Sequence, residues 1–206
     1  MNTTERLKKL TSNFEEVGCE AFFVTKLINI RYLTGFTGSA GKLWVTKDKA
    51  VLFTDGRYAE QAPAETENTS IEVVIQVQGF DKTLKELSDG VTRLGLEAAS
   101  ITWEQQQQIS EWIPSVDLVP TMGLIEKIRE VKDLEELVHM KEAASIADKA
   151  LLAATEMFVS GTTEKHLAAV LDHEMRKHGA SDRSFETIVA AGPNSALPHA
   201  RPTDRP

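Results

Sequence analysis

The chain has 206 residues, of which 41% are hydrophobic and 26% charged, a composition ordinary for a globular protein with a sizeable core. Its 31 aspartate and glutamate residues outnumber its 23 lysine and arginine residues, and the net charge of −8 argues against a basic nucleic-acid-binding surface. No apolar run reaches the ~18 residues of a membrane span, the polar N-terminus predicts no secretory signal, and the single cysteine, Cys19, favours a cytoplasmic protein.

The first part of the chain alternates helix and strand patterns. Apolar residues at three- and four-residue spacing predict a helix over residues 2–17 that ends at Gly18. The other predicted elements are strands at 21–25, 42–46, 50–54, 71–77, 94–97 and 117–119, and helices at 82–87 and 103–112. The strands at 42–46 and 50–54 flank a Lys-Asp-Lys turn and are expected to form a hairpin. Residues 1–122 are therefore predicted to form a mixed-sheet α/β domain.

Beyond Pro120 the pattern becomes helical. Asp133 and Glu136 have capping-box spacing and start a predicted helix that runs to about Met157. The expected buried face of this helix consists of Leu134, Leu137, Val138, Met140, Ala144, Ile146, Ala147 and Leu151. A second helix is predicted at 164–178 and a strand at 184–190. Two helices and one strand cannot complete a domain, so residues 123–206 are expected to be the incomplete start of a second one.

Two short motifs in the first part contain glycine. The loop Gly35–Gly41 has the spacing GxxGxxG, but a strand follows it instead of Gly-Lys-Ser/Thr and a helix, so a phosphate-binding loop is not supported. A tight loop that uses the conformational freedom of glycine is favoured. Thr54–Tyr58 ends a strand at an Asp-Gly turn. Its Arg57 has no evident partner in the sequence and is either a surface charge or a clamp for a carboxylate.

All five histidines lie in the last third of the chain. His166 and His173 are seven residues apart on one predicted helix face, but HExxH spacing and a cysteine cluster are both absent. Their charged neighbours, Glu164 among them, predict a solvated face instead of a metal site. His178 lies near the helix C-terminus, where an imidazolium is favourable.

His199 lies in a loop bounded by proline and glycine that follows the predicted strand. A loop histidine held over a cleft is suited to proton transfer or to hydrogen bonding with a polarised carbonyl. A histidine that merely faces water is an equal alternative. There is no GxSxG elbow, and no histidine is near Cys19 in sequence, so nucleophilic catalysis has no support.

Taken together, these motifs resemble a known family. The segments NIRYLTGFTGS at 29–39 and LFTDGRY at 52–58 are similar to the N-terminal domain of Xaa-Pro aminopeptidases. The later segments resemble the start of the "pita-bread" catalytic domain that these enzymes share with prolidase and creatinase: Ile128-Arg129 with Lys132, Gly161 with Glu164, Ser184-Phe185 with Ile188, and Gly192–His199. The resemblance implies a creatinase-like α/β domain followed by an incomplete α+β pita-bread domain.

The resemblance implies hydrolysis by two divalent metal ions, usually manganese, which activate water and polarise the scissile carbonyl. In the family, two Asp, one His and two Glu hold the ions, and all five follow the segment that matches Gly192–His199. The sequence given reaches Pro206, so no metal ligand is expected here, and we expect a truncated, inactive chain that binds no metal. His199 corresponds to the family histidine that contacts the substrate without binding the metal.

The implied substrates are short peptides with proline at the second position, and the implied assembly is a homodimer or a higher homo-oligomer. We hypothesise that the Gly35–Gly41 loop and Arg57 border the substrate site of a neighbouring subunit. Two alternatives remain: a fragment of a prolidase-type X-Pro dipeptidase, and a non-catalytic peptide-binding module of the pita-bread type. The motifs at 35–41 and 54–58 favour the aminopeptidase.

Overall fold

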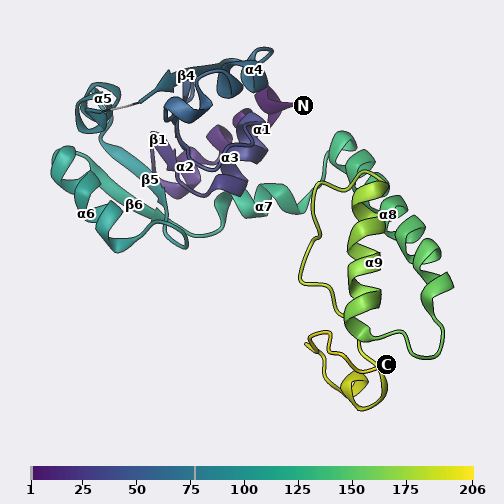
Figure 1. The fold of residues 1–206 in the computed structure, drawn as a ribbon. Coiled ribbons are helices and arrows are strands. Elements are labelled where there is room, and N and C mark those ends of the chain that lie inside the picture. Colours follow the sequence, from purple (N-terminus) through teal and green to yellow (C-terminus); the bar gives the residue numbers. More distant parts are fainter. Residues whose placement is uncertain (1, 77) are drawn as a thin grey trace. The chain divides into compact units, whose positions relative to one another are not determined.

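The computed structural model describes residues 2–76 and 78–206, and the chain divides into two compact units, one ending at Val131 and one beginning at Lys132 (Figure 1). The first unit contains α1 (Thr3–Ser12), α2 (Phe14–Val17), β1 (Ala21–Val24), α3 (Leu27–Thr34), β2 (Lys42–Val45), β3 (Ala50–Thr54), the 3-10 turn η1 (Gly56–Tyr58), α4 (Gln61–Thr66), β4 (Ile71–Ile75), α5 (Phe80–Leu87), β5 (Arg93–Glu97), α6 (Trp103–Trp112), β6 (Asp117–Thr121) and α7 (Leu124–Glu130). The second contains α8 (Leu134–Ala154), η2 (Thr155–Met157), α9 (Glu164–Lys177) and η3 (Gly192–Ala196).

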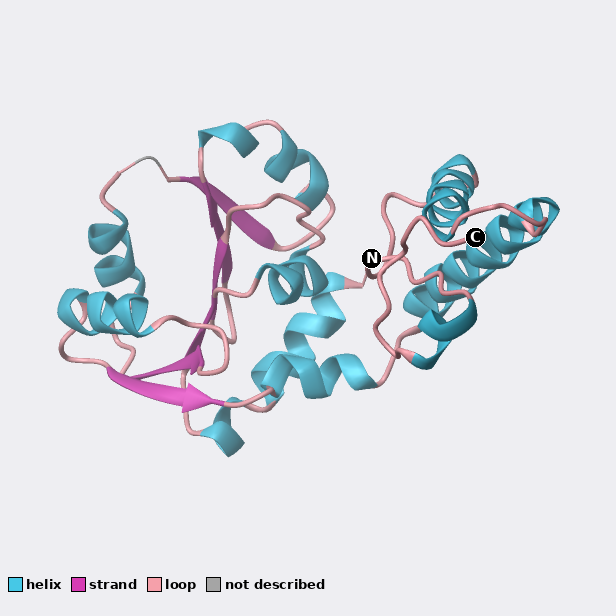
Figure 2. Cartoon of the chain, turned by 60° about the horizontal axis from the view of Figure 1, so that its bottom comes forward, coloured by secondary structure: helices cyan, strands magenta, loops and turns pink. Residues whose placement is uncertain are grey.

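The six strands form one sheet in the order β4-β3-β2-β1-β5-β6, with helices on both of its faces (Figure 2). The pairs β1–β2 and β2–β3 are antiparallel, whereas β1–β5, β3–β4 and β5–β6 are parallel. The predicted mixed α/β sheet and its β2–β3 hairpin are confirmed. In β6, which is an outer strand, Pro120 lies opposite Leu96.

Successive side chains along each strand lie on opposite faces of the sheet, and each face packs into its own core. In β1, Phe22 and Val24 belong to the core beneath α1–α4 and α7, whereas Ala21 and Phe23 belong to the core beneath α5 and α6. Successive strand residues point to opposite faces, so a strand buried on both sides is apolar throughout. Each fully buried leucine or phenylalanine contributes roughly 1.5–3 kcal/mol to folding.

Helix α7 extends the first unit beyond the expected boundary at residue 122. Gly123 precedes the helix in a left-handed conformation with φ of +63°, and Leu124 and Ile125 are then buried in the first core. The helix also contacts α1. This packing carries the first unit to Val131.

Two strand predictions differ from the structure. Strand β4 ends at Ile75, and Val77, the last residue of the predicted strand, lies outside the described residues. Residues 184–190 were expected to form a strand but have no regular structure. A strand needs a neighbouring backbone for its hydrogen bonds, and the described part of the second unit supplies none.

In the second unit, α8 and α9 lie side by side (Figure 1). The predicted capping box is confirmed: Asp133 Oδ1 accepts from Glu136 N at 2.9 Å, and Glu136 Oε2 accepts from Asp133 N at 3.0 Å. The expected buried face of α8 is wrong, since Leu134 is 84% exposed and Val138 61%. Its apolar side chains have too few neighbours to cover them in this chain. Within the described ranges, no helix is long and apolar enough to cross a bilayer.

Candidate functional site

The first turn of α9 binds a loop through one carboxylate. Glu164, the first residue of α9, is only 2% exposed. Its Oε1 accepts hydrogen bonds from Ala191 N at 2.7 Å and from Asn194 Nδ2 at 3.0 Å. Its Oε2 accepts from Thr203 N at 2.8 Å and from Thr203 Oγ1 at 2.7 Å. The sequence placed Glu164 on a solvated helix face, and the structure corrects this, because the loop covers it.

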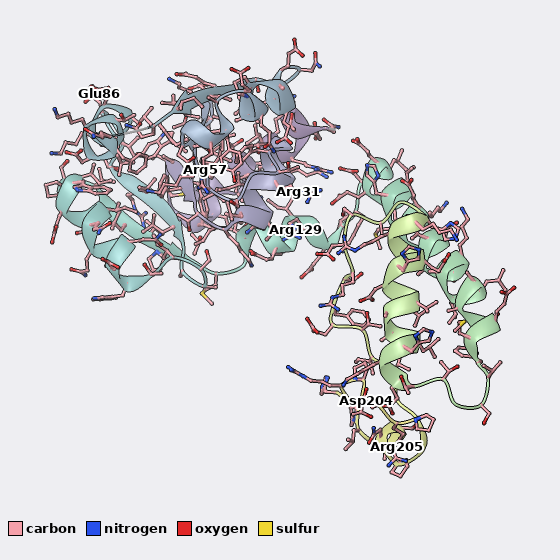
Figure 3. The ribbon with its side chains drawn as sticks, viewed as in Figure 1. Arg31, Arg57, Glu86, Arg129, Asp204 and Arg205 are labelled. Carbon is pink, nitrogen blue, oxygen red and sulfur yellow. The ribbon has the colours of Figure 1, made fainter. Side chains whose placement is uncertain are left out.

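Two backbone hydrogen bonds and one ion pair hold the end of the same segment. Glu164 N donates to Arg205 O at 2.9 Å, Lys165 N donates to Thr203 O at 3.1 Å, and Lys165 Nζ contacts Asp204 Oδ2 at 2.7 Å. Figure 3 shows Asp204 and Arg205 beside the N-terminal end of α9. Residues 191–203 therefore form a closed loop, here called the 191–203 loop, whose two ends meet at Glu164.

The loop changes the acidity of Glu164. The hydroxyl of Thr203 and the backbone N–H of Ala191 are the main causes, and together with the other donors they lower the pKa of Glu164 from 4.5 to about 2. Hydrogen bonds to the ionised form outweigh the opposing effect of burial. Glu164 is consequently a carboxylate at neutral pH.

His199 lies between the two attached ends of the 191–203 loop. It follows η3 in a turn in which Ala200 N donates to Leu197 O at 3.2 Å. The His199 side chain is exposed, whereas its neighbour Ala200 is buried. The loop thus presents the imidazole to solvent while its own backbone is fixed. Sequence reasoning identified His199 but did not identify the Glu164 contacts that hold its loop, because they join residues far apart in sequence.

Arg57 has a partner, contrary to the sequence-based expectation. Asp55 Oδ1 accepts from Arg57 Nε at 2.9 Å, and Asp55 Oδ2 accepts from the Arg57 guanidinium at 2.7 Å. The same carboxylate caps η1, which brings the two side chains together at a spacing of two residues. This pairing raises the pKa of Arg57 and lowers that of Asp55. Arg57 remains 66% exposed, so its outer edge is accessible.

The two glycine motifs of the first unit meet in space. Tyr58 of η1 accepts a hydrogen bond from Ser39 N at 3.0 Å, and its ring packs edge-on against Phe36 at 5.3 Å. Thr54 Oγ1 donates to Ala40 O at 2.7 Å. A Cβ on Gly38 would lie 2.2 Å from the Phe36 ring, which explains the glycine there. The Gly35–Gly41 loop is thus rigidly attached to the segment that carries Arg57.

A second polar cluster, which the sequence did not predict, joins α3 to β5 and α7. Asn29 is fully buried, and its Nδ2 donates to Glu97 Oε1 at 2.7 Å and to Glu126 Oε1 at 2.8 Å. Its Oδ1 accepts from Arg129 at 2.9 Å, and Figure 3 labels Arg129 on α7. Burial raises the pKa of Glu126, but hydrogen bonds from Lys26 and Asn29 lower it further, below its ordinary value. We assign this cluster to the stability of the first unit.

The described residues offer no set of side chains for a metal centre. In the described ranges, no three His, Cys, Asp or Glu side chains lie close enough together to hold an ion. His166 and His173 are exposed on α9 and His178 is exposed at its C-cap, where its Nε2 lies 3.7 Å from Glu174 Oε2. These residues do not fit a metal centre.

Comparisons with known proteins agree with the motifs. Residues 6–131 match the creatinase/prolidase N-terminal domain, and residues 138–206 match metallopeptidase family M24. The chain is 37% identical over 202 residues to "Uncharacterized peptidase YqhT" of Bacillus subtilis, which covers 97% of this chain and 57% of that protein.

Solved structures give the same result. An Xaa-Pro dipeptidase from Bacillus anthracis superposes with a TM-score of 0.92 at 33% identity, covering 99% of this chain and 57% of that one. An X-Pro aminopeptidase from Thermotoga maritima superposes with a TM-score of 0.84 at 30% identity, and the match covers 94% of this chain and 56% of that one. The chain therefore spans a little over half the length of the proteins that it matches. It belongs to the family in which a creatinase/prolidase N-terminal domain precedes a metallopeptidase M24 region.

Proposed function

We propose that this chain is part of a cytoplasmic Xaa-Pro metalloaminopeptidase, which hydrolyses the bond before proline in short peptides with proline at the second position. The observation that carries the proposal is the 191–203 loop, which is closed on Glu164 and presents an exposed His199 within the region that matches family M24. A prolidase-type dipeptidase is the second candidate, because solved relatives carry both names.

His199 is assigned to substrate contact. The X-Pro amide has no N–H, so the groups of that bond that remain available for recognition are the carbonyl oxygen and the ring. An imidazole can donate a hydrogen bond to such a carbonyl or transfer a proton near neutral pH. The divalent ions that the family implies, with manganese proposed, would supply an activated water and a polarised carbonyl. The residues described here would not hold those ions.

The first test joins this chain to the remaining part of the Bacillus anthracis dipeptidase. We expect the chimaera to hydrolyse Ala-Pro bonds and to spare Ala-Ala bonds, and His199→Ala to lower kcat/KM by roughly 10²-fold or more. The chain alone, incubated with manganese and desalted, should retain no metal and hydrolyse neither substrate. A comparison of Ala-Pro with Ala-Pro-Ala separates dipeptidase from aminopeptidase. Equal cleavage of Ala-Ala and Ala-Pro, or turnover by the chain alone, would contradict the proposal.

Arg57 and the Gly35–Gly41 loop are proposed to border the substrate site of a neighbouring subunit in a homodimer or larger homo-oligomer. In the same chimaera, Arg57→Ala should raise KM or shift the preferred peptide length, since the exposed guanidinium edge can contact a peptide carboxylate. Lys85→Ala, at an exposed position on α5, is the matched control. Kinetics with di-, tri- and tetrapeptides would measure KM and the preferred peptide length, and light scattering would measure the size of the assembly. If Arg57→Ala leaves KM, the length preference and the assembly unchanged, the assignment is wrong.

A further inference from the structure

A crevice opens at the carboxyl ends of β3 and β4. These strands are parallel neighbours, and the chain leaves β3 toward α4, whose Ala62 lies in the first core, and leaves β4 toward α5, whose Leu84 lies in the second. Connections that diverge to opposite faces of a sheet leave a crevice between them, and this is where open α/β sheets bind ligands. A cavity of about 330 Å³ occupies this position.

Lys42 supplies a positive charge to this cavity. It is the first residue of β2, lies opposite Phe53, and its Nζ is 4.1 Å from the centre of the Phe80 ring. The side chain is half-buried, and burial lowers its pKa. In the described parts of the chain, no carboxylate forms an ion pair with it. The face of the Phe80 ring offsets part of the cost of taking this cation out of water, and an anion bound beside Lys42 would offset more of it.

The remaining lining of the cavity complements an anion with an apolar body. Gly79, with φ of +72°, is the N-cap residue of α5 and lies at the rim with Phe80, so the positive end of that helix borders the cavity. Phe80, which is partly buried, supplies the apolar wall, and Phe53 backs it from the second core with only 2% of its surface exposed. Asp55 also lines the cavity, but both of its oxygens are bound by Arg57.

We propose that this crevice binds a small monocarboxylate with an apolar body, with the carboxylate at Lys42 and the body against Phe80. One cation matches one negative charge, and the volume is at the small end of the range for ligand cavities. The proposal is independent of the peptidase assignment.

The test uses the whole chain, labelled with ¹⁵N and ¹³C, and benzoate as the probe in an NMR titration. We expect saturable shifts of the amides of Gly41, Lys42, Gly79 and Phe80, with a dissociation constant on the order of 1 mM. The neutral isostere benzamide should bind at least about tenfold more weakly, because it lacks the charge that Lys42 recognises. Equal shifts with benzamide, or no saturation with benzoate, would overturn the proposal.

Lys42→Met keeps the apolar stem, and we expect it to weaken benzoate binding by about tenfold or more. Lys47→Met, at an exposed position in the turn of the same hairpin, should bind benzoate as the unchanged chain does. A further measurement needs no variant: bound benzoate should raise the pKa of Lys42, followed at its ¹³Cε resonance, and leave that of Lys47 unaltered. A Lys42 titration that benzoate does not move would count against the site even if Lys42→Met failed to fold.

Discussion

Glu164→Gln is expected to release the 191–203 loop from α9. The amide has the shape of the carboxylate but offers one acceptor and one donor, so its NH₂ group would face Ala191 N and Asn194 or face Thr203, all of which donate. A buried donor facing a donor loses its hydrogen bond without replacement. Hydrogen–deuterium exchange in the 191–203 loop should accelerate at least ~10-fold, while the middle of α8 is unaffected.

Glu174→Gln is the matched control, since Glu174 lies on the same helix and, among the described residues, its carboxylate pairs with Lys177 and His178 and not with the loop. It should leave exchange in the loop unchanged. If Glu164→Gln also leaves it unchanged, Glu164 does not hold the loop.

The same carboxylate predicts how the loop responds to acid. The pKa of Glu164 is about 2 in the folded chain, and an unfolded glutamate has a pKa of about 4.3. Because the folded value is depressed, the stabilisation is complete above about pH 4.3 and is lost as the pH falls through about 2. Loop amide resonances of the unchanged chain should therefore move together in this window, and those of Glu164→Gln should not. A loop that opens already near pH 5 would contradict this assignment.

Asn29→Asp is expected to have the largest effect on the first unit. The substitution preserves shape but places a third carboxylate beside Glu97 and Glu126 and removes the two donors that they share. Arg129 would still donate to one oxygen of the new carboxylate, but repulsion by Glu97 and Glu126 and the loss of both donors should lower the free energy of unfolding by about 2–4 kcal/mol. Asn29→Ala, which adds no charge, should lower the free energy of unfolding by less than Asn29→Asp does. Urea unfolding followed by tryptophan fluorescence reports this unit alone, because all three tryptophans, Trp44, Trp103 and Trp112, lie in it.

Asn68→Asp is the control, because Asn68 is exposed in the turn before β4. Asn68→Asp should change the free energy of unfolding by no more than about 0.5 kcal/mol. If Asn29→Asp behaved like Asn68→Asp, the cluster around Asn29 would contribute nothing measurable to stability.

Elements with a local cause could be predicted from the sequence. Asp133 and Glu136 cap α8 through their own side chains, and the turn between β2 and β3 is set by residues within it. Helix α3 has no such signal, since its residues are mostly apolar and its N-cap residue, Lys26, makes no side-chain cap. Its start is held by Glu97, which accepts from Lys26 N at 2.8 Å. That contact depends on the pairing of β1 with β5, so it cannot be predicted from the sequence near α3 alone.

In the candidate site, too, local features could be predicted from the sequence, whereas contacts between side chains could not. The loop around His199 could be located because proline and glycine mark it, and Arg57 because it follows a turn. The partners of these residues could not be inferred. Asp55 is close in sequence to Arg57, yet only the η1 conformation turns its carboxylate toward the guanidinium. Glu164 resembles an ordinary first-turn glutamate, which usually faces water, until the returning chain covers it.

Pro120 affects which edge of the sheet can pair with a strand from another chain. An outer strand with free N–H and C=O groups is a template onto which another chain can add by strand pairing. Proline has no N–H to offer, so β6 cannot bind an incoming strand continuously across this position. The opposite border of the sheet, β4, has no proline within Ile71–Ile75. Any growth of the sheet by strand addition is thus directed to β4 and disfavoured at β6, which gives the sheet one permissive and one protected border.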